Sequence, residues 1–285
     1  GVRWENVTLG VPDFTTIASS NSTFVQGGSP SFDTLLKNAG VVAEPIDGLS
    51  VFASYAQGFT MPDAGLILRA VRTPGQSVED LVDLQPVIAD NIEIGSSYRR
   101  GGLDLSASYF WSNSDLGSRI QVIGGAGVIQ RERTEIKGLE LSASYRFASG
   151  ARIGGALAAL EGRYDSDADG QVDRDLDGRN IAPNRLNLFA EAPIIAGLRG
   201  RVQVSQLFER EFDGGQPRFN FSGYTLVDAI LSYESEKAGR FTLGVANLFD
   251  MQYITYTSQT ANFINDRNYS SGRGRAFTLR WQGSF

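Results

Sequence analysis

The stretch Leu103-Asp104-Leu105-Ser106-Ala107-Ser108-Tyr109-Phe110-Trp111-Ser112 indicates the fold class of this chain. Successive side chains of a β-strand point to opposite faces, so residues two apart share a face. Here Leu103, Leu105, Ala107, Tyr109 and Trp111 alternate with Asp104, Ser106, Ser108 and Ser112. The end of the chain repeats the pattern, with Phe277, Leu279, Trp281 and Phe285 set against Thr278, Arg280, Gln282 and Ser284. Both segments predict strands with one apolar and one polar face.

Segments of this kind recur along the chain and predict about 12 strands. Their expected cores are 2–10, 36–46, 48–58, 90–100, 102–113, 134–147, 151–161, 185–195, 198–209, 222–234, 239–248 and 273–285. Five short links carry glycine, two of them directly after Asp or Ser, which suits tight hairpins: 46–48, 100–102, 148–150, 195–197 and 234–239. The alternate links are long: 11–35, 59–89, 114–133, 162–184, 210–221 and 249–272.

This alternation of short and long links is typical of an antiparallel transmembrane β-barrel. Such barrels have short periplasmic turns, long extracellular loops, an apolar face toward lipid and a polar face toward the lumen. A soluble β-sandwich, the alternative, spaces its turns by 8–12 residues without this two-sidedness. Aromatic side chains near the strand ends match the girdles of membrane barrels: Tyr55, Tyr98, Tyr109, Trp111, Tyr145, Phe147, Tyr233 and Trp281.

Composition narrows the function. The 285 residues carry a net charge of -6 and contain no cysteine and no histidine. An acidic chain is a poor match for nucleic acid, which usually binds a basic face. Without histidine, a Ser-His-Asp triad and His-ligated metal sites are impossible. We therefore expect a protein that is not an enzyme and needs no cofactor.

The N-terminus carries no signal peptide, which a protein exported to an outer membrane requires. Residue 1 is a glycine that leads directly into the strand-like run Val2-Arg3-Trp4-Glu5. We interpret the chain as a mature product or, in preference, as a piece of a longer protein.

Six motifs in order along the chain resemble those of TonB-dependent outer-membrane receptors. They are Ser54-Tyr55-Ala56-Gln57-Gly58-Phe59 with Met61-Pro62-Asp63, Asn91-Ile92-Glu93-Ile94-Gly95, Gly138-Leu139-Glu140, Gly223-Tyr224-Thr225-Leu226-Val227-Asp228, Asn247-Leu248-Phe249-Asp250 with Tyr253, and the ending from Gly272-Arg273-Gly274-Arg275 to Phe285. The resemblance covers residues 50–285.

The resemblance implies a fold and a function. Receptors of this family have a barrel of about 22 strands that encloses an N-terminal plug domain. They import mostly ferric siderophores, with energy delivered by the TonB complex. The chain resembles the C-terminal half of such a barrel over residues 1–285, without the plug domain and the N-terminal strands. Arg131-Glu132-Arg133, Tyr253, Gln259 and Gly272-Arg273-Gly274-Arg275 are similar to receptors for hydroxamate-citrate siderophores of the aerobactin kind.

Two alternatives to the receptor stay open at this point. One is a passive outer-membrane pore made of these strands alone, because a sheet of twelve strands, an even number, could close into a small barrel. The other is a soluble β-rich binding module. The expected partners of the receptor are a ferric siderophore, the plug domain of the same protein, the TonB complex and outer-membrane lipid.

The long links contain cations and aromatic side chains that suit an anionic ferric chelate. Arginine binds carboxylates in a bidentate manner, and aromatic rings cover apolar or cationic groups. The candidates are Arg69, Arg72, Arg131, Arg133, Phe208, Arg210, Arg218, Phe219, Tyr253 and Tyr256. The alternative is that the arginines are solvated and the aromatics belong to the girdle. Glu140, Asp228 and Glu234 lie on polar strand faces, so we expect them in the lumen, with no catalytic pairing.

Asp165-Ser166-Asp167-Ala168-Asp169-Gly170 repeats the opening of an EF-hand calcium loop. Counting on, the carbonyl of Gln171 falls at position seven and Asp173 at position nine. Position twelve holds Leu176 where a glutamate is expected, and Asp177 comes one residue late. The sequence predicts weak calcium binding by Asp165, Asp167, Asp169, Gln171, Asp173 and Asp177. A solvated acidic loop balanced by Arg163, Arg174 and Arg179 is the alternative.

Overall fold

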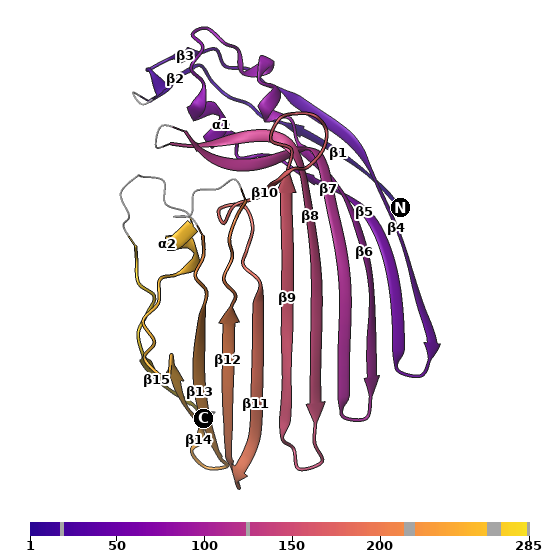
Figure 1. Ribbon diagram of the computed structural model, residues 1–285, viewed down its shortest axis with the longest axis vertical. Helices are drawn as coiled ribbons and strands as arrows, with labels where there is room; N and C mark the ends of the chain where they lie inside the picture. The colour runs from indigo at the N-terminus through magenta and orange to yellow at the C-terminus, as the bar shows by residue number, and fades with distance from the viewer. Residues whose placement is uncertain (18–19, 124–125, 214–219, 261–268, 284–285) are drawn as a thin grey trace.

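The computed structural model describes residues 1–285 except 18–19, 124–125, 214–219, 261–268 and 284–285. One tall, curved antiparallel sheet dominates this part of the chain (Figure 1). Its strands follow the order β1-β4-β5-β6-β7-β8-β9-β11-β12-β13-β14-β15, and the short β10 pairs with β9. The prediction of an antiparallel sheet of about 12 strands is therefore confirmed.

The strands of this path have the following bounds: β1 Val2–Thr8, β4 Ser31–Ile46, β5 Leu49–Thr60, β6 Val87–Arg100, β7 Leu103–Ile123, β8 Ala126–Arg146, β9 Arg152–Tyr164, β11 Arg185–Ile195, β12 Leu198–Leu207, β13 Tyr224–Ser235, β14 Gly239–Ala246 and β15 Ala276–Gln282. The remaining elements are β2 (Phe14–Thr15), β3 (Phe24–Val25), β10 (Arg174–Asp175), the helices α1 (Ala64–Ala70) and α2 (Tyr256–Thr260), and two 3₁₀ turns, Val78–Asp80 and Val82–Leu84.

The strands meet in tight turns at one end of the sheet and in long loops at the other (Figure 1). All five predicted turns contain a glycine with positive φ, a conformation that residues with a Cβ atom rarely adopt. These glycines are Gly48, Gly101, Gly150, Gly197 and Gly239. The two ends are therefore built by different rules, as the spacing of the links predicts.

The apolar face is exposed between two levels of aromatic side chains. Near the turns lie Tyr98, Tyr145, Tyr233 and Trp281, and toward the loops lie Tyr55 and Trp111. The register places Tyr145 opposite Leu103 and Trp111 opposite Lys137. These two levels are thus separated by roughly 27 Å of strand, close to the height of the lipid-facing band of a barrel. We conclude that this face contacts lipid.

The polar face, which lines the lumen, is hydrogen-bonded across strands. Ser106 and Ser142 share a hydrogen bond of 2.7 Å, and Ser205 donates to Asn187 at 3.0 Å. Glu191 pairs with Arg199 at 3.1 Å and with Arg201 at 3.4 Å. Polar side chains satisfied in this way suit a wet interior.

Three phenylalanines on the lumen face each cover a glycine directly opposite on the neighbouring strand. The pairs are Phe52 with Gly95, Phe110 with Gly138, and Phe189 with Gly154. A Cβ added to any of these glycines would overlap the facing ring. Glycine leaves each ring room to lie on the sheet, a recognised way to stabilise glycine within strands.

The loop end differs from expectation in one respect. Residues 114–133 were expected as a long link, but β7 and β8 continue through it as a paired hairpin beyond the aromatic level, with a bulge between Ser114 and Gly117. This part bends over the upper end of the sheet (Figure 1). Both of its faces lie outside the bilayer, so the residues need not alternate and the strand signal is lost.

The loops carry two small apolar cores. One joins α1 to the loop before β4 and to the β7–β8 hairpin; its buried residues are Val25, Ile67, Val71, Val78, Leu84 and Ile129. The other contains Leu176, Ile181 and Phe212, packed against Ile136, Leu160 and Tyr164. The loops therefore form a structured layer with buried centres of its own.

Within the described residues, β1 and β15 each have only one neighbouring strand. The sheet is curved but not closed. Among the helices of the same residues, none has the length and apolar character that crossing a bilayer requires.

Candidate functional site: the loop layer

The acidic loop that follows β9 is folded around the carboxylate of Asp165. This side chain is 5% exposed and accepts hydrogen bonds from the backbone N–H groups of Ala168 at 2.8 Å and Gly170 at 2.7 Å. Burial raises the pKa of Asp165, but these backbone donors outweigh it and hold the pKa below its ordinary value. One carboxylate oxygen from each of Asp165, Asp167 and Asp169 lies within 4.8 Å of the others. Three carboxylates are thus gathered at one point, as the spacing predicts.

The other nominated calcium ligands have different contacts. Asp173 accepts from the backbone and the hydroxyl of Ser166 at 2.9 and 2.8 Å, which lowers its pKa. Asp177 pairs with Arg179 and accepts from Asn180 at 2.8 Å. Gln171 donates its N–H to Asp169 at 2.8 Å. Calcium binding by the whole set stays a prediction.

Asn180 fastens this loop to the β7–β8 hairpin. Its side-chain oxygen accepts from the N–H of Ile120 at 2.7 Å, and its amide donates to the carbonyl of the same residue at 3.1 Å. The side chain thereby satisfies a backbone donor and acceptor at once.

Contacts among Arg163, Asp175 and Asp213, here called the clasp, join the acidic loop to the loop after β12. Asp175 and Asp213 each accept from the other's backbone N–H, at 3.0 and 2.5 Å. The guanidinium of Arg163 lies 3.4 Å from both carboxylates and supplies the positive charge between them. This pair of loops is therefore held by charge-assisted contacts as well as by the apolar core that contains Phe212.

The nominated arginines lie in two settings. Arg69 and Arg72, at the end of α1, are exposed, although Arg69 also donates to the carbonyl of Gly127 at 3.4 Å. Arg131 is half-buried and donates to the carbonyls of Leu116, Asp83 and Pro86 at 2.8, 3.3 and 3.4 Å, and burial lowers its pKa. Its role in the structure is to join β7 to the loop before β6.

Arg133 and Arg210 also make contacts within the layer. Arg133 donates to the carbonyl of Gly170 at 3.0 Å and lies 3.8 Å from Asp115. Arg210 donates to the carbonyl of Leu160 at 3.0 Å, and its guanidinium lies 5.2 Å from the ring centre of Phe212. Arg218 and Phe219 lie outside the described residues.

Two of the nominated aromatics lie beside Arg210, whose backbone exchanges two hydrogen bonds of 2.8 Å with that of Phe221. Tyr253 packs on Tyr224 with ring centres 4.5 Å apart, and Tyr256 packs edge-on against Phe221 at 4.8 Å. The hydroxyl of Tyr256 donates to the carbonyl of Ile181, and burial raises its pKa to about 12. Phe208 is 37% exposed. The structure thus gathers Tyr253 and Tyr256 into an aromatic cluster with Phe221 and Tyr224.

Two of the sequence motifs meet at this cluster. The N–H of Asn247 donates to Asp228 at 2.8 Å, so the two motifs that contain these residues are joined. Asn247 is buried with φ of 51°, and its amide donates to the carbonyl of Met251 at 2.9 Å. Asp228 was expected on the lumen face without a catalytic partner; the structure adds that its carboxylate stabilises the start of the loop after β14.

Sequence reasoning missed one buried ion pair. Arg119 of β7 forms two hydrogen bonds with Glu132 of β8, at 2.7 and 2.9 Å, and its guanidinium lies 4.0 Å from the ring centre of Tyr164. Burial lowers the pKa of Arg119, but Glu132 more than compensates and the net shift is upward. A signal was present, since a hairpin through 114–133 places opposite charges close to each other.

The geometry above describes a lipid-facing antiparallel sheet with a structured loop layer at one end. A family model described as TonB dependent receptor-like, beta-barrel matches residues 1–248. The chain belongs to this family, whose members are outer-membrane receptors and transporters.

Two curated relatives narrow the resemblance. The ferric aerobactin receptor of Klebsiella pneumoniae is 24% identical over 313 residues, covering 100% of this chain and 41% of that protein. The rhizobactin receptor of Rhizobium meliloti (strain 1021) is 24% identical over 305 residues, covering 98% and 40%. The similarity to aerobactin-type receptors inferred from the sequence is confirmed. The chain spans about two fifths of the length of these relatives.

Solved structures share the fold. The copper transporter OprC superimposes with a TM-score of 0.80 at 16% identity, covering 97% of this chain and 44% of that one. The ferric-catecholate import receptor Fiu from E. coli K12 gives 0.71 at 19% identity, covering 98% and 41%. At these identities the likeness concerns the fold alone.

Proposed function

We propose that this chain is the C-terminal part of the barrel of a bacterial outer-membrane receptor that imports a ferric siderophore. In this account the loop layer captures the chelate, and the polar face of the sheet contacts the plug domain of the same protein. The TonB complex supplies the energy for import. Aerobactin-type ferric chelates are the first ligands to test, because a relative that the whole chain matches is a ferric aerobactin receptor.

The observation that carries the proposal is the asymmetry between the two ends of the sheet. One end has only tight turns. The other carries loops that contain two apolar cores, the clasp of Arg163 with two carboxylates, and exposed cations such as Arg69 and Arg72. A passive pore has no need for a loop layer organised to this degree. Unpaired strand edges cannot face lipid, so the open edges of β1 and β15 also favour a larger barrel.

The test is uptake of labelled iron by the full-length receptor that contains this chain. The receptor is expressed in a strain that lacks its own siderophore receptors, with and without a functional TonB. We expect uptake of ferric aerobactin only when TonB is present. Uptake that persists without TonB would contradict the proposal.

A conductance measurement separates the receptor from its alternatives. In planar bilayers, a plugged receptor is closed at rest, whereas a passive pore conducts. A protein that purifies and stays monomeric without detergent would instead be a soluble binding module.

A further inference from the structure

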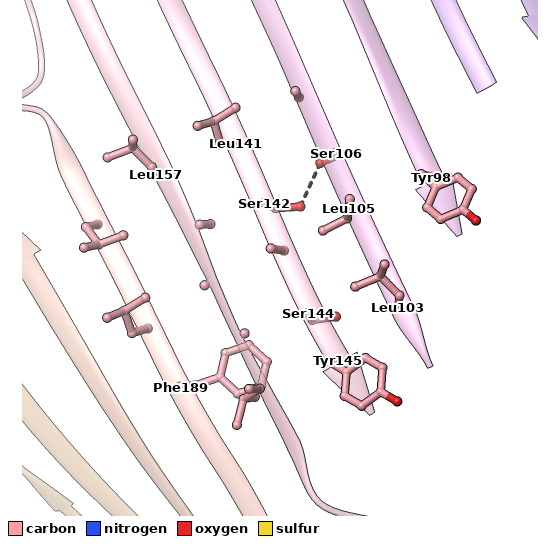
Figure 2. Close-up of a pocket in the computed structure, with 18 of the residues that line it drawn as sticks. Tyr98, Leu103, Leu105, Ser106, Leu141, Ser142, Ser144, Tyr145, Leu157 and Phe189 are labelled. Carbon is pink, nitrogen blue, oxygen red and sulfur yellow. Dashed lines mark hydrogen bonds between the residues drawn. The ribbon is translucent and has the colours of Figure 1, made fainter. Parts of the chain in front are cut away.

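A groove of about 840 Å³ crosses the apolar face of the sheet from β6 to β11, away from the loop layer. Its volume is within the range of roughly 300–1,000 Å³ that is usual for pockets that enclose small ligands. Figure 2 shows Leu103 and Leu105 on one side of it and Leu141 and Leu157 on the other. The Ser106–Ser142 hydrogen bond drawn there belongs to the polar face.

The groove exists because large and small side chains are staggered between neighbouring strands. Ser96 lies opposite Ala107, and one level nearer the turns Ala143 lies opposite Gly155. At the same two levels the neighbouring strands carry large side chains: Tyr98 lies opposite Leu105, and Leu141 lies opposite Leu157. A diagonal channel therefore runs between two rows of large residues.

The chemistry of the lining excludes a siderophore-like ligand. None of the described residues that line the groove carries a charge, and most of its accessible surface is apolar. An anionic chelate needs cations or a dense set of donors. An apolar chain needs neither.

The position of the groove selects its occupant. Tyr98 and Tyr145 lie near the tight turns, at the aromatic level on the periplasmic side. Figure 2 shows both rings at the same end of the groove, with their hydroxyl groups directed away from Leu141 and Leu157. Tyrosine at such a level places its ring in the apolar region and its hydroxyl at the lipid headgroups.

We propose that the groove is a seat for one acyl chain of a phospholipid in the periplasmic leaflet. The chain lies along the channel floored by Ala107, Ala143 and Gly155, and the headgroup lies beside the hydroxyls of Tyr98 and Tyr145. This seat is independent of the transported ligand. It fixes a lipid on the barrel wall at the strands that continue into the β7–β8 hairpin of the loop layer.

The experiment uses the full-length receptor in liposomes that contain phosphatidylethanolamine with a photoreactive diazirine on one acyl chain. After illumination, cross-linked peptides are mapped and quantified. We expect cross-links to concentrate on 103–109 and 141–157. Ala143→Leu fills the floor and should lower this signal about tenfold, the equivalent of roughly two methylene groups no longer buried.

The matched control is Ala53→Leu, which adds the same atoms to the apolar face of β5, opposite Ile94 and outside the groove. It should leave the cross-links unchanged. Cross-links spread evenly around the barrel, or equal in wild type and Ala143→Leu, would overturn the proposal. In each of these cases the uptake assay can still succeed, so the two proposals fail separately.

Discussion

Single carboxylates organise the acidic loop. Asp165 takes backbone donors from its own loop, while Asp173 and Asp177 are engaged by Ser166 and by Arg179 with Asn180. Much of the loop is therefore stable through internal hydrogen bonds. Asp167 and Asp169 are exposed and complete the group of three carboxylates.

We predict that calcium binds at this group with the affinity of weak extracellular modules, a dissociation constant of about 10⁻⁴–10⁻³ M. Calcium should raise the thermal stability of the full-length receptor, because a ligand that binds only the folded state stabilises it. Asp167→Ala combined with Asp169→Ala should abolish the response. The control Asp47→Ala, in the turn after β4, should respond as wild type. An identical calcium response in all three proteins would remove the site.

Tyr256 gives the loop layer a pH dependence at high pH. Its pKa is about 12 in the folded protein, against an ordinary value of 10.0. The folded state therefore binds the phenol proton of Tyr256 more tightly than the unfolded state does. The contribution of this proton to the free energy of unfolding is complete below pH 10 and is lost as the pH rises toward 12. Protease resistance of the loop at residues 249–272, measured across this range, should fall in wild type. The Tyr256→Phe variant should already be less resistant to the protease at pH 8, but its resistance should not fall further as the pH rises. An equal fall in wild type and variant would show that Tyr256 does not cause the pH dependence.

At the scale of elements, the loops act as a block because separate segments are tied by specific side chains. Arg163 neutralises Asp175 and Asp213, which come from two different loops. Arg163→Gln should weaken this junction by about 1 kcal/mol, the upper value for a partly exposed ion pair. Cleavage within 165–184 and 208–222 by a protease should then become about fivefold faster, with no change in the stability of the barrel.

Arg240→Gln is the matched control for this substitution. It removes an exposed ion pair with Glu234 at the opposite end of the sheet. The loops should be cleaved at the wild-type rate. Equal cleavage of both variants and wild type would show that the clasp does not hold the loops together.

The facing phenylalanine and glycine pairs explain two of the sequence motifs. Gly95 and Gly138 stand in those motifs, and each is covered by a ring from the adjacent strand. Gly138→Ala should destabilise the barrel by about 1–3 kcal/mol through overpacking against Phe110. Urea unfolding of the full-length receptor in liposomes measures this.

A glycine in a roomier place provides the comparison. A Cβ on Gly244 of β14 would come no closer than 3.9 Å to Thr278, so Gly244→Ala should be tolerated. Adding Phe110→Ala to Gly138→Ala should recover part of the loss. If the Gly138 and Gly244 variants unfold alike, the rings do not set the requirement for glycine.

For the whole molecule, the sequence was sufficient where side chains meet lipid. Alternation at 103–112 and glycine at the tight turns predicted the strands and their order, because bilayer and lumen impose opposite demands on the two faces. The same reasoning failed for 114–133, where Arg119 and Glu132 pair outside the bilayer. It also gave no indication of α1, α2 or β10, because elements this short are stable only when tertiary contacts support them.

The candidate site was predictable in part. The spacing of Asp165, Asp167 and Asp169 was enough to place them together, since all three lie in one short loop. The sequence could not show which contacts the arginines and aromatic residues of the layer make, because their partners come from distant loops. Arg131 donates to the carbonyl of Asp83, and Tyr256 donates to the carbonyl of Ile181. Contacts between distant loops depend on the register of the whole sheet.

The orientation of the sheet in the membrane is the claim on which the rest depends, and spin labels test it directly. The chain has no cysteine, so single cysteines can be placed at 105, 107 and 109 and at 104, 106 and 108 of the full-length receptor, provided the remainder is also cysteine-free. In liposomes, labels at the odd positions should collide with oxygen dissolved in the bilayer. Labels at the even positions should be protected from oxygen and lie in the lumen. Equal oxygen accessibility at both sets, or the opposite alternation, would contradict the account.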